Sequence, residues 1–281
     1  MSEAGSSSSM ASDLNRRVPS AIAMIALALG ATWYGGIPFL FFWTVAALAV
    51  WYEWATIVGA EPRTNVVASG AIVIVAAAIF LGMGMTGAAA ATMFLGALGC
   101  GFLANGNERT QMWTGAGMLY AALVFIPVVL LRADVKFGFF AVIWLYAVVW
   151  LTDIGGYFFG RFIGGKKLAP VLSPKKTWSG AIGGTFFGVL GGAMVATLAD
   201  ARFAFMSIVI ALLVSVFSQA GDIFESFVKR KFGKKDASGI LPGHGGVMDR
   251  IDGFLAAATL ALLIGLIHRG ASAPAMGLLQ W

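Results

Sequence analysis

Residues 222–252 read DIFESFVKRKFGKKDASGILPGHGGVMDRID and form the longest polar segment of the chain. Long apolar runs flank this segment on both sides, in a sequence that is 59% hydrophobic and only 11% charged. It contains five of the thirteen acidic residues, six of the nineteen basic residues and one of the two histidines. Because so much of the charge is gathered in one place, we predict that this segment builds a functional site.

The apolar remainder of the chain indicates a membrane protein. Its mean hydropathy is +0.86. A soluble domain of 281 residues would need far more polar surface, so most of the chain is expected to be surrounded by lipid. The single cysteine, Cys100, excludes a disulfide framework or a cysteine-based metal site within one chain. We interpret it as a small apolar helix residue.

Runs of about 20 mainly apolar residues predict membrane-spanning helices. Residues 1–17 are rich in serine and are predicted to form a disordered tail, which leaves residues 18–281 as a single transmembrane domain. The predicted fold class is therefore all-α and polytopic. Nine spanning helices are expected, at residues 18–34, 37–57, 66–84, 86–104, 113–131, 137–153, 179–199, 203–222 and 251–268.

The positions of the basic residues predict how these helices are oriented. With a cytoplasmic N-terminus, fifteen of the nineteen basic residues fall in cytoplasmic segments and four in outer segments. The positive-inside rule expects this asymmetry, and nine helices then place the C-terminus outside. Two cytoplasmic loops are long, roughly residues 152–178 and 223–250. Because both loops face the same side of the membrane, we expect them to form one pocket.

The acidic residues of the second loop predict a divalent-metal site. Asp249 and Asp252 are spaced i, i+3 at the start of the ninth helix. Oxygen ligands of this kind suit Mg²⁺ that shares a phosphate-bearing substrate. In the alternative, the acids neutralise neighbouring basic residues at the headgroup level. Four further residues share one face if the eighth helix continues past the membrane surface: Asp222, Glu225, Ser226 and Lys229.

The rest of this loop predicts phosphate binding. The sequence PGHGG at 242–246 cannot be a regular helix, and its glycines let backbone amides approach a ligand closely. His244 is suited to donate to a phosphate or to act as a general acid, although a histidine that only fixes the turn explains the sequence equally well. A basic run precedes it and would recognise a polyphosphate and a lipid phosphate, or alternatively anionic headgroups: Lys229, Arg230, Lys231, Lys234 and Lys235.

The first long loop carries a second polar group. Asp153 lies near a predicted helix end, where an uncompensated carboxylate is costly, so a partner is expected. Ser173 or Thr177 is expected to cap the next helix, and Lys175 and Lys176 lie beside that helix start, which favours anions. Elsewhere, the acid in the sequence WYEW at 51–54 is interpreted as part of an interfacial aromatic belt.

The polar segment resembles the signature of the phosphatidate cytidylyltransferase (CDP-diglyceride synthase) family. Two segments of the first loop, DIGGY from residue 153 and SPKKTW from residue 173, are similar to further family segments. The first third of the chain agrees by hydropathy only. A motif with so many fixed polar positions is highly specific, and its matching residues are Ser226, Lys229, Arg230, Lys235, Asp236, Pro242, His244, Gly245, Gly246, Asp249, Arg250 and Asp252.

This resemblance implies an enzyme that converts CTP and phosphatidic acid into CDP-diacylglycerol and pyrophosphate. It implies a multi-pass enzyme of the bacterial inner membrane that acts as a homodimer, with a cytoplasmic active site and no nucleic-acid partner. It also implies a requirement for Mg²⁺, with a second cation allowed. Asp222 and Asp249 are assigned to the metal, supported by Asp153, Asp236 and Asp252.

For this reaction we also assign the substrate contacts as a hypothesis. No strong base is needed because the attacking lipid phosphate is already ionised, so loss of the metal site is expected to matter more than loss of His244. The triphosphate and the lipid headgroup are assigned to Lys229, Arg230, Lys235 and Arg250, with Lys175 and Lys176 closing the pocket. The remaining contacts are assigned to Ser173, Thr177, Ser226, Gly245 and Gly246.

Three other functions compete with this one. A CDP-alcohol phosphatidyltransferase is excluded because no further acid follows Asp249 and Asp252 in the ninth helix. A CTP-dependent lipid kinase would also use CTP and Mg²⁺, but it would release CDP instead of pyrophosphate. A transporter would place charges near the bilayer midplane in broken helices, whereas the acids here cluster at one surface.

Overall fold

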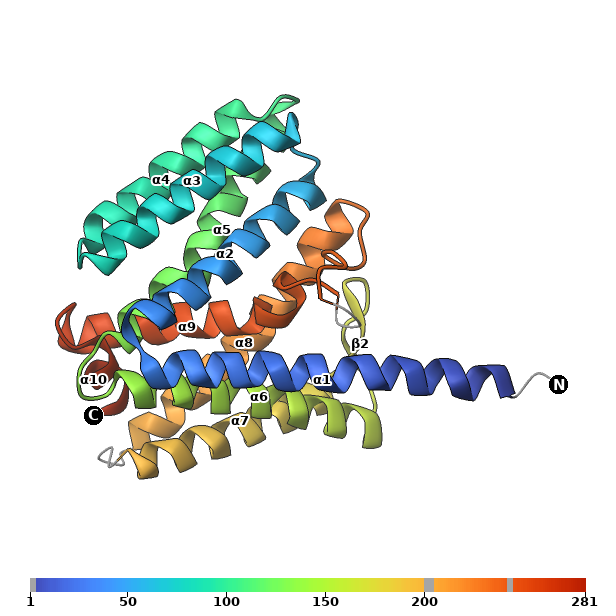
Figure 1. The fold of residues 1–281 in the computed structure, drawn as a ribbon. Helices are drawn as coiled ribbons and strands as arrows, with labels where there is room; N and C mark the ends of the chain where they lie inside the picture. Colours follow the sequence, from blue (N-terminus) through green and yellow to red (C-terminus); the bar gives the residue numbers. More distant parts are fainter. Residues whose placement is uncertain (1–3, 200–204, 242–244) are drawn as a thin grey trace.

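The fold is a bundle of long helices with one small β-hairpin (Figure 1). The structure, a computed structural model, describes the backbone of residues 4–199, 205–241 and 245–281, and within these ranges the side chains from Pro19 onward. The described elements are α1 (Ala4–Tyr34), α2 (Gly36–Val58), α3 (Arg63–Gly82), α4 (Thr86–Leu103), α5 (Glu108–Arg132), α6 (Gly138–Phe162), β1 (Lys167–Ala169), β2 (Ser173–Thr177), α7 (Trp178–Leu198), α8 (Phe205–Lys231), α9 (Met248–Arg269) and α10 (Pro274–Leu279).

The helices of the described residues fit a polytopic membrane protein. Eight of them, α2 to α9, are long and apolar enough to cross a membrane. The apolar part of α1, Pro19–Tyr34, is shorter. Each predicted span coincides with one helix, so the polytopic helical class is confirmed. A ninth span through α1 stays a prediction.

Two details of the predicted fold differ from the structure over the described residues. Helix α1 begins at Ala4, where the sequence predicted a disordered tail up to residue 17. The first long loop is also largely structured. Helix α6 continues to Phe162 instead of ending near residue 153, and β1 and β2 form an antiparallel pair, so the chain is not purely α-helical.

Close packing against α7 explains the extension of α6. The two helices contact each other along most of their length, and glycines on both sides let the backbones meet. A Cβ on Gly184 would lie 2.5 Å from the carbonyl oxygen of Thr152, and a Cβ on Gly155 would lie 3.0 Å from the carbonyl oxygen of Gly183. Helix α6 therefore carries Asp153 and the residues after it along the face of α7.

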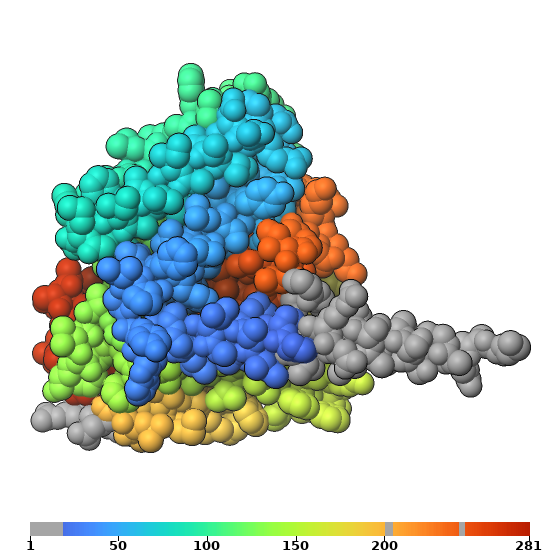
Figure 2. Space-filling model, viewed as in Figure 1, coloured from blue at the N-terminus to red at the C-terminus, as the bar shows by residue number. Residues whose placement is uncertain are grey.

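Helix α2 is fixed firmly in the bundle. Trp51 and Trp54 are fully buried, and their indole nitrogens donate to the carbonyl oxygens of Val67 in α3 at 3.2 Å and Trp113 in α5 at 2.7 Å. Such bonds satisfy polar groups that lipid cannot satisfy. Helices α8 and α9 pack along each other, and α9 also contacts α2 and α5. The segment that joins α8 to α9 lies against α2 in the space-filling view (Figure 2).

Candidate active site

A pocket of about 1100 Å³ lies where α6, β2, α8 and α9 meet. Both long polar segments contribute to its walls, so the structure brings together the two groups that the sequence predicted to share one site. The predicted residues that line the pocket are Asp153, Lys175, Lys176, Thr177, Asp222, Ser226, Lys229, Asp236, Gly245, Asp249, Arg250 and Asp252.

Helix α8 supplies one wall because it continues to Lys231 without a break. Residues three and four apart share a helical face. Asp222, Glu225, Ser226 and Lys229 therefore face the pocket together. The condition attached to the sequence pattern, that the eighth helix extends past its apolar part, is met.

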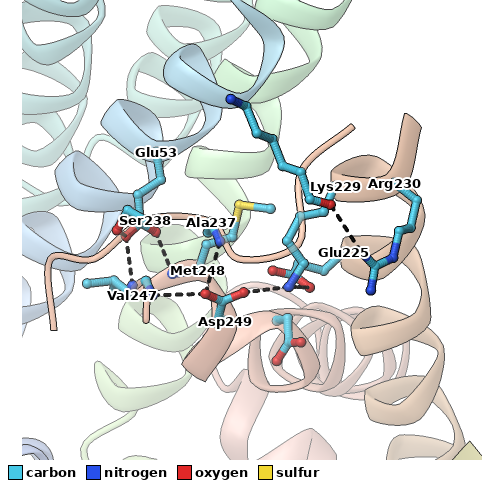
Figure 3. Close-up of polar contacts among 12 residues, drawn as sticks. Glu53, Glu225, Lys229, Arg230, Ala237, Ser238, Val247, Met248 and Asp249 are labelled. Carbon is cyan, nitrogen blue, oxygen red and sulfur yellow. Dashed lines mark hydrogen bonds and ion pairs between the residues drawn. The ribbon is translucent and has the colours of Figure 1, made fainter. Parts of the chain in front are cut away.

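Lys229 joins the two helices of this wall (Figure 3). Its Nζ lies 2.7 Å from Glu225 Oε2 in α8 and 2.5 Å from Asp249 Oδ1 in α9. The three side chains are 12%, 1% and 10% exposed, respectively. Charges so far from water interact strongly, so the lysine attracts both carboxylates and offsets the repulsion between them.

Asp249 also organises the loop between α8 and α9. Its Oδ2 accepts hydrogen bonds from the backbone nitrogens of Gly246 at 2.8 Å and Ala237 at 3.1 Å. The two donors precede and follow the bridge between Leu241 and Gly245 that closes the loop. The carboxylate therefore fixes the loop and Lys229 at the same time.

The opposite wall comes from β2 and the start of α7. Lys176 in β2 forms an ion pair with Asp222 in α8, which joins the two polar segments directly. Thr177 caps α7, because its Oγ1 accepts a hydrogen bond from Gly180 N at 3.1 Å. Of the two predicted capping residues, Thr177 fills this role, whereas Ser173 begins β2 opposite Ala169.

Four predicted residues do not line the pocket: Ser173, Arg230, Lys235 and Gly246. Arg230 follows Lys229 by one residue, a rotation of about 100° around the helix. Its Nη1 donates to the carbonyl oxygen of Lys234 at 3.4 Å. Gly246 supports the loop through its bond to Asp249. His244 lies outside the described residues.

Comparisons with known proteins show the family of this chain. The family model described as Cytidylyltransferase family matches residues 15–268. The chain belongs to this cytidylyltransferase family. It is 43% identical to the phosphatidate cytidylyltransferase of Brucella suis biovar 1 over 264 residues, which are 94% of this chain and 97% of the relative. The Brucella abortus biovar 1 protein of the same name is 44% identical over 257 residues, 91% of this chain and 94% of the relative.

A further relative matches a shorter part of the chain. The phosphatidate cytidylyltransferase of Staphylococcus saprophyticus is 43% identical over 119 residues, which are 42% of this chain and 46% of the relative. The resemblance seen in the polar motif is confirmed by these matches, and the two Brucella relatives extend it over nearly the whole chain.

The pocket of this cytidylyltransferase-family chain includes residues that the sequence analysis did not assign. Tyr157 and Arg161 follow Asp153 by four and eight residues, and the helical period would have indicated them had α6 been predicted to continue. Gln219 precedes Asp222 by one turn, and its Nε2 donates to Thr185 Oγ1 at 2.9 Å. The lining residues with polar side chains that the sequence analysis did not name are Thr152, Tyr157, Arg161, Gln219 and Ser238.

The donor set of the pocket fits Mg²⁺. Within the part of the chain that the structure describes, no three His, Cys, Asp or Glu side chains converge on one point. Mg²⁺ usually takes only one or two carboxylates and completes its shell with water and substrate phosphate. Asp222 and Asp249 can provide these carboxylates. Glu225 Oε1 is buried without a hydrogen-bond partner among the described residues, and a nearby cation would compensate this acceptor.

Proposed function

We propose that this chain is a phosphatidate cytidylyltransferase, which makes CDP-diacylglycerol and pyrophosphate from CTP and phosphatidic acid. The names of the Brucella relatives and the family match support this function. The observation that carries it in the structure is one pocket that combines carboxylates, lysines and arginines at the ends of apolar helices. Its volume of about 1100 Å³ exceeds the roughly 300–1000 Å³ of pockets for one small ligand, and so suits a nucleotide together with a lipid headgroup.

The reaction requires two anions to meet. A phosphate oxygen of phosphatidic acid attacks the α-phosphorus of CTP and forms the new P–O bond. The bond from the α-phosphorus to the bridging oxygen of the β-phosphate breaks, and pyrophosphate leaves with that electron pair. Basic side chains lower the repulsion between the partners and stabilise the charge of the leaving group. The pocket offers Arg161, Lys175, Lys176, Lys229 and Arg250 for this purpose.

Mg²⁺ is part of the proposal. Asp222 and Asp249 would hold it, with Asp153, Asp236 and Asp252 close by in the same pocket. When bound, the ion would neutralise phosphate charge and favour in-line geometry. Lys176 and Lys229 already pair with the two ligands, and they keep the carboxylates in place before the nucleotide arrives.

Pyrophosphate release is the first test of the proposed function. Purified protein in detergent is expected to release pyrophosphate only when CTP, phosphatidic acid and Mg²⁺ are all present. Omission of each component serves as the control, together with chelation by EDTA. CDP without pyrophosphate would instead indicate a CTP-dependent lipid kinase. A folded sample that turns over neither product would contradict an enzymatic role.

The proposed orientation has a cytoplasmic N-terminus, an outer C-terminus and the pocket at the cytoplasmic face of a bacterial inner membrane. The excess of basic residues in the segments near the pocket supports it. In a Cys100→Ser background, Val135→Cys between α5 and α6 is expected to react with an impermeant maleimide in intact spheroplasts. Lys235→Cys is expected to react only after lysis. Val135 is fully exposed and Lys235 is exposed, so the reverse pattern would overturn the orientation.

A homodimer is also proposed, and light scattering in detergent tests this oligomeric state.

A further inference from the structure

Glu53 in α2 is a buried carboxylate that contacts the polar loop (Figure 3). Its side chain is 0% exposed. Oε1 accepts hydrogen bonds from Ser238 Oγ at 2.5 Å and from Val247 N at 2.8 Å, and Oε2 accepts one from Met248 N at 2.7 Å. These partners follow Glu53 by 185 to 195 residues in the chain. The belt position expected from the sequence is therefore wrong for this residue.

The charge of Glu53 is balanced by backbone amides. None of the ion pairs formed among the described residues includes Glu53. Val247 and Met248 begin α9, and Val247 makes no capping bond with its own side chain. The first amides of a helix lack partners within it and carry partial positive charge. Glu53 thus caps α9 from another helix, which explains how its carboxylate remains buried.

Glu53 and Asp249 hold the same loop by neighbouring atoms. Ala237 N donates to Asp249 and the next residue, Ser238, donates to Glu53. At the other end, Gly246 N donates to Asp249, while Val247 and Met248 donate to Glu53. Two stretches, residues 237–238 and 246–248, are therefore each held by both carboxylates. Several lining residues lie within or beside the loop, including Asp236, Ser238, Gly245 and Arg250.

Two further features show that this contact is closely built. A Cβ on Gly246 would lie 2.7 Å from Glu53 Oε1 and 2.8 Å from the Cβ of Ala237, so only glycine lets the loop approach the carboxylate. The residues on either side of Glu53 in the WYEW sequence anchor α2 through the buried Trp51 and Trp54. The carboxylate is thus presented to the loop from a helix that is itself anchored in the bundle.

We propose that Glu53 is a positioning residue for the transfer reaction. It does not line the pocket and does not touch the reactants. It fixes the loop and the first turn of α9, and thereby sets where Asp249 and Arg250 stand in the pocket. A charge on Glu53 is required, because three donors face its two oxygens and no acceptor lies among them.

The test is Glu53→Gln, which keeps the shape of the side chain. One carboxylate oxygen becomes an NH₂ group that opposes N–H or O–H donors. The kcat for pyrophosphate release is expected to fall about 10- to 100-fold, the usual loss when a group that orients a ligand side chain is replaced. The KM for CTP is expected to stay within about threefold, because Glu53 does not contact substrate. Glu61→Gln is the matched control, since Glu61 is exposed and bonds only to its neighbour Arg63 among the described contacts of its side chain.

A second readout does not depend on activity. Amide exchange in peptides that cover residues 245–252 is expected to accelerate on the order of tenfold in Glu53→Gln, about the factor that one hydrogen bond to a charged group supplies. The inference rests on the proposed function for its kinetic readout alone. The exchange measurement therefore tests the inference separately from that function. If wild-type protein releases no pyrophosphate, the exchange result still tests the anchor.

Two variants keep the test sharp. Ser238→Ala removes one of the three bonds and is expected to show a smaller effect in the same direction. Glu53→Asp keeps the charge and is expected to retain more kcat than Glu53→Gln, and both variants serve if Glu53→Gln does not fold. The proposal is overturned if folded Glu53→Gln matches wild type in kcat and exchange, or if Glu61→Gln loses as much activity.

Discussion

Asp249→Asn is expected to lower the kcat for pyrophosphate release by about 100- to 1000-fold, the cost of losing one preorganised electrostatic contact at a reacting centre. The carboxylate accepts from Lys229 at Oδ1 and from two backbone amides at Oδ2. Asparagine has one acceptor oxygen, so its NH₂ group must oppose either the ammonium or the amides. The same change removes one of the two proposed Mg²⁺ ligands.

The measurement is pyrophosphate release per folded molecule, with folded protein counted after size-exclusion chromatography in detergent. Glu108→Gln is the control, because Glu108 is an exposed acid at the start of α5, away from the pocket. Asp249→Glu restores the charge and is expected to recover part of the activity. Activity of Asp249→Asn within tenfold of wild type would leave the function standing and remove Asp249 from the metal site.

The sequence predicted the spans because hydropathy over about 20 residues is a local property. It also predicted most of the pocket, because the polar motif lies in two continuous segments. The position of Arg230 outside the pocket could also have been predicted from the sequence. A helix turns about 100° per residue, so Lys229, which follows Glu225 by four residues and Ser226 by three, shares their face, whereas Arg230 lies further round the helix. The period of α8 already favoured Lys229 over Arg230, and the structure has that arrangement.

Other features could not be predicted from local pattern. The extension of α6 depends on glycine contacts with α7 between residues nearly thirty positions apart, such as Gly155 and Gly183. The role of Glu53 depends on a loop almost two hundred residues later. An acid between tryptophans looks the same in the sequence whether it faces headgroups or caps a distant helix. Only the packing of α2 beside α9 distinguishes the two.

Lys229→Met is expected to lower the free energy of unfolding by about 3–5 kcal/mol, the usual cost of removing one partner from a buried ion pair. Glu225 and Asp249, which are 1% and 10% exposed, would then face each other without a cation. Methionine fills a similar volume, so lost packing contributes little. The variant is also expected to lose nearly all pyrophosphate release, because Lys229 is the basic group nearest to Asp249 in the pocket wall.

A double variant separates charge balance from chemistry. Lys229→Met combined with Glu225→Gln removes one negative charge along with the positive one, and it is expected to regain about half of the lost stability, since non-additivity is the mark of interacting charges. It is not expected to regain activity, because the ammonium is still absent from the pocket.

Arg230→Met is the matched control, one residue further along α8 with its exposed side chain outside the pocket, and it should keep stability and turnover near wild type. Equal losses in the Lys229 and Arg230 variants would mean that the basic run acts as a diffuse surface charge. If Lys229→Met has the same free energy of unfolding as wild type, the ion pairs of Lys229 between α8 and α9 do not stabilise the fold. If the expected results are obtained, Lys229 both holds Glu225 and Asp249 together and presents a positive charge to the phosphates. The extension of α8 to Lys231 places Lys229 where it can do both.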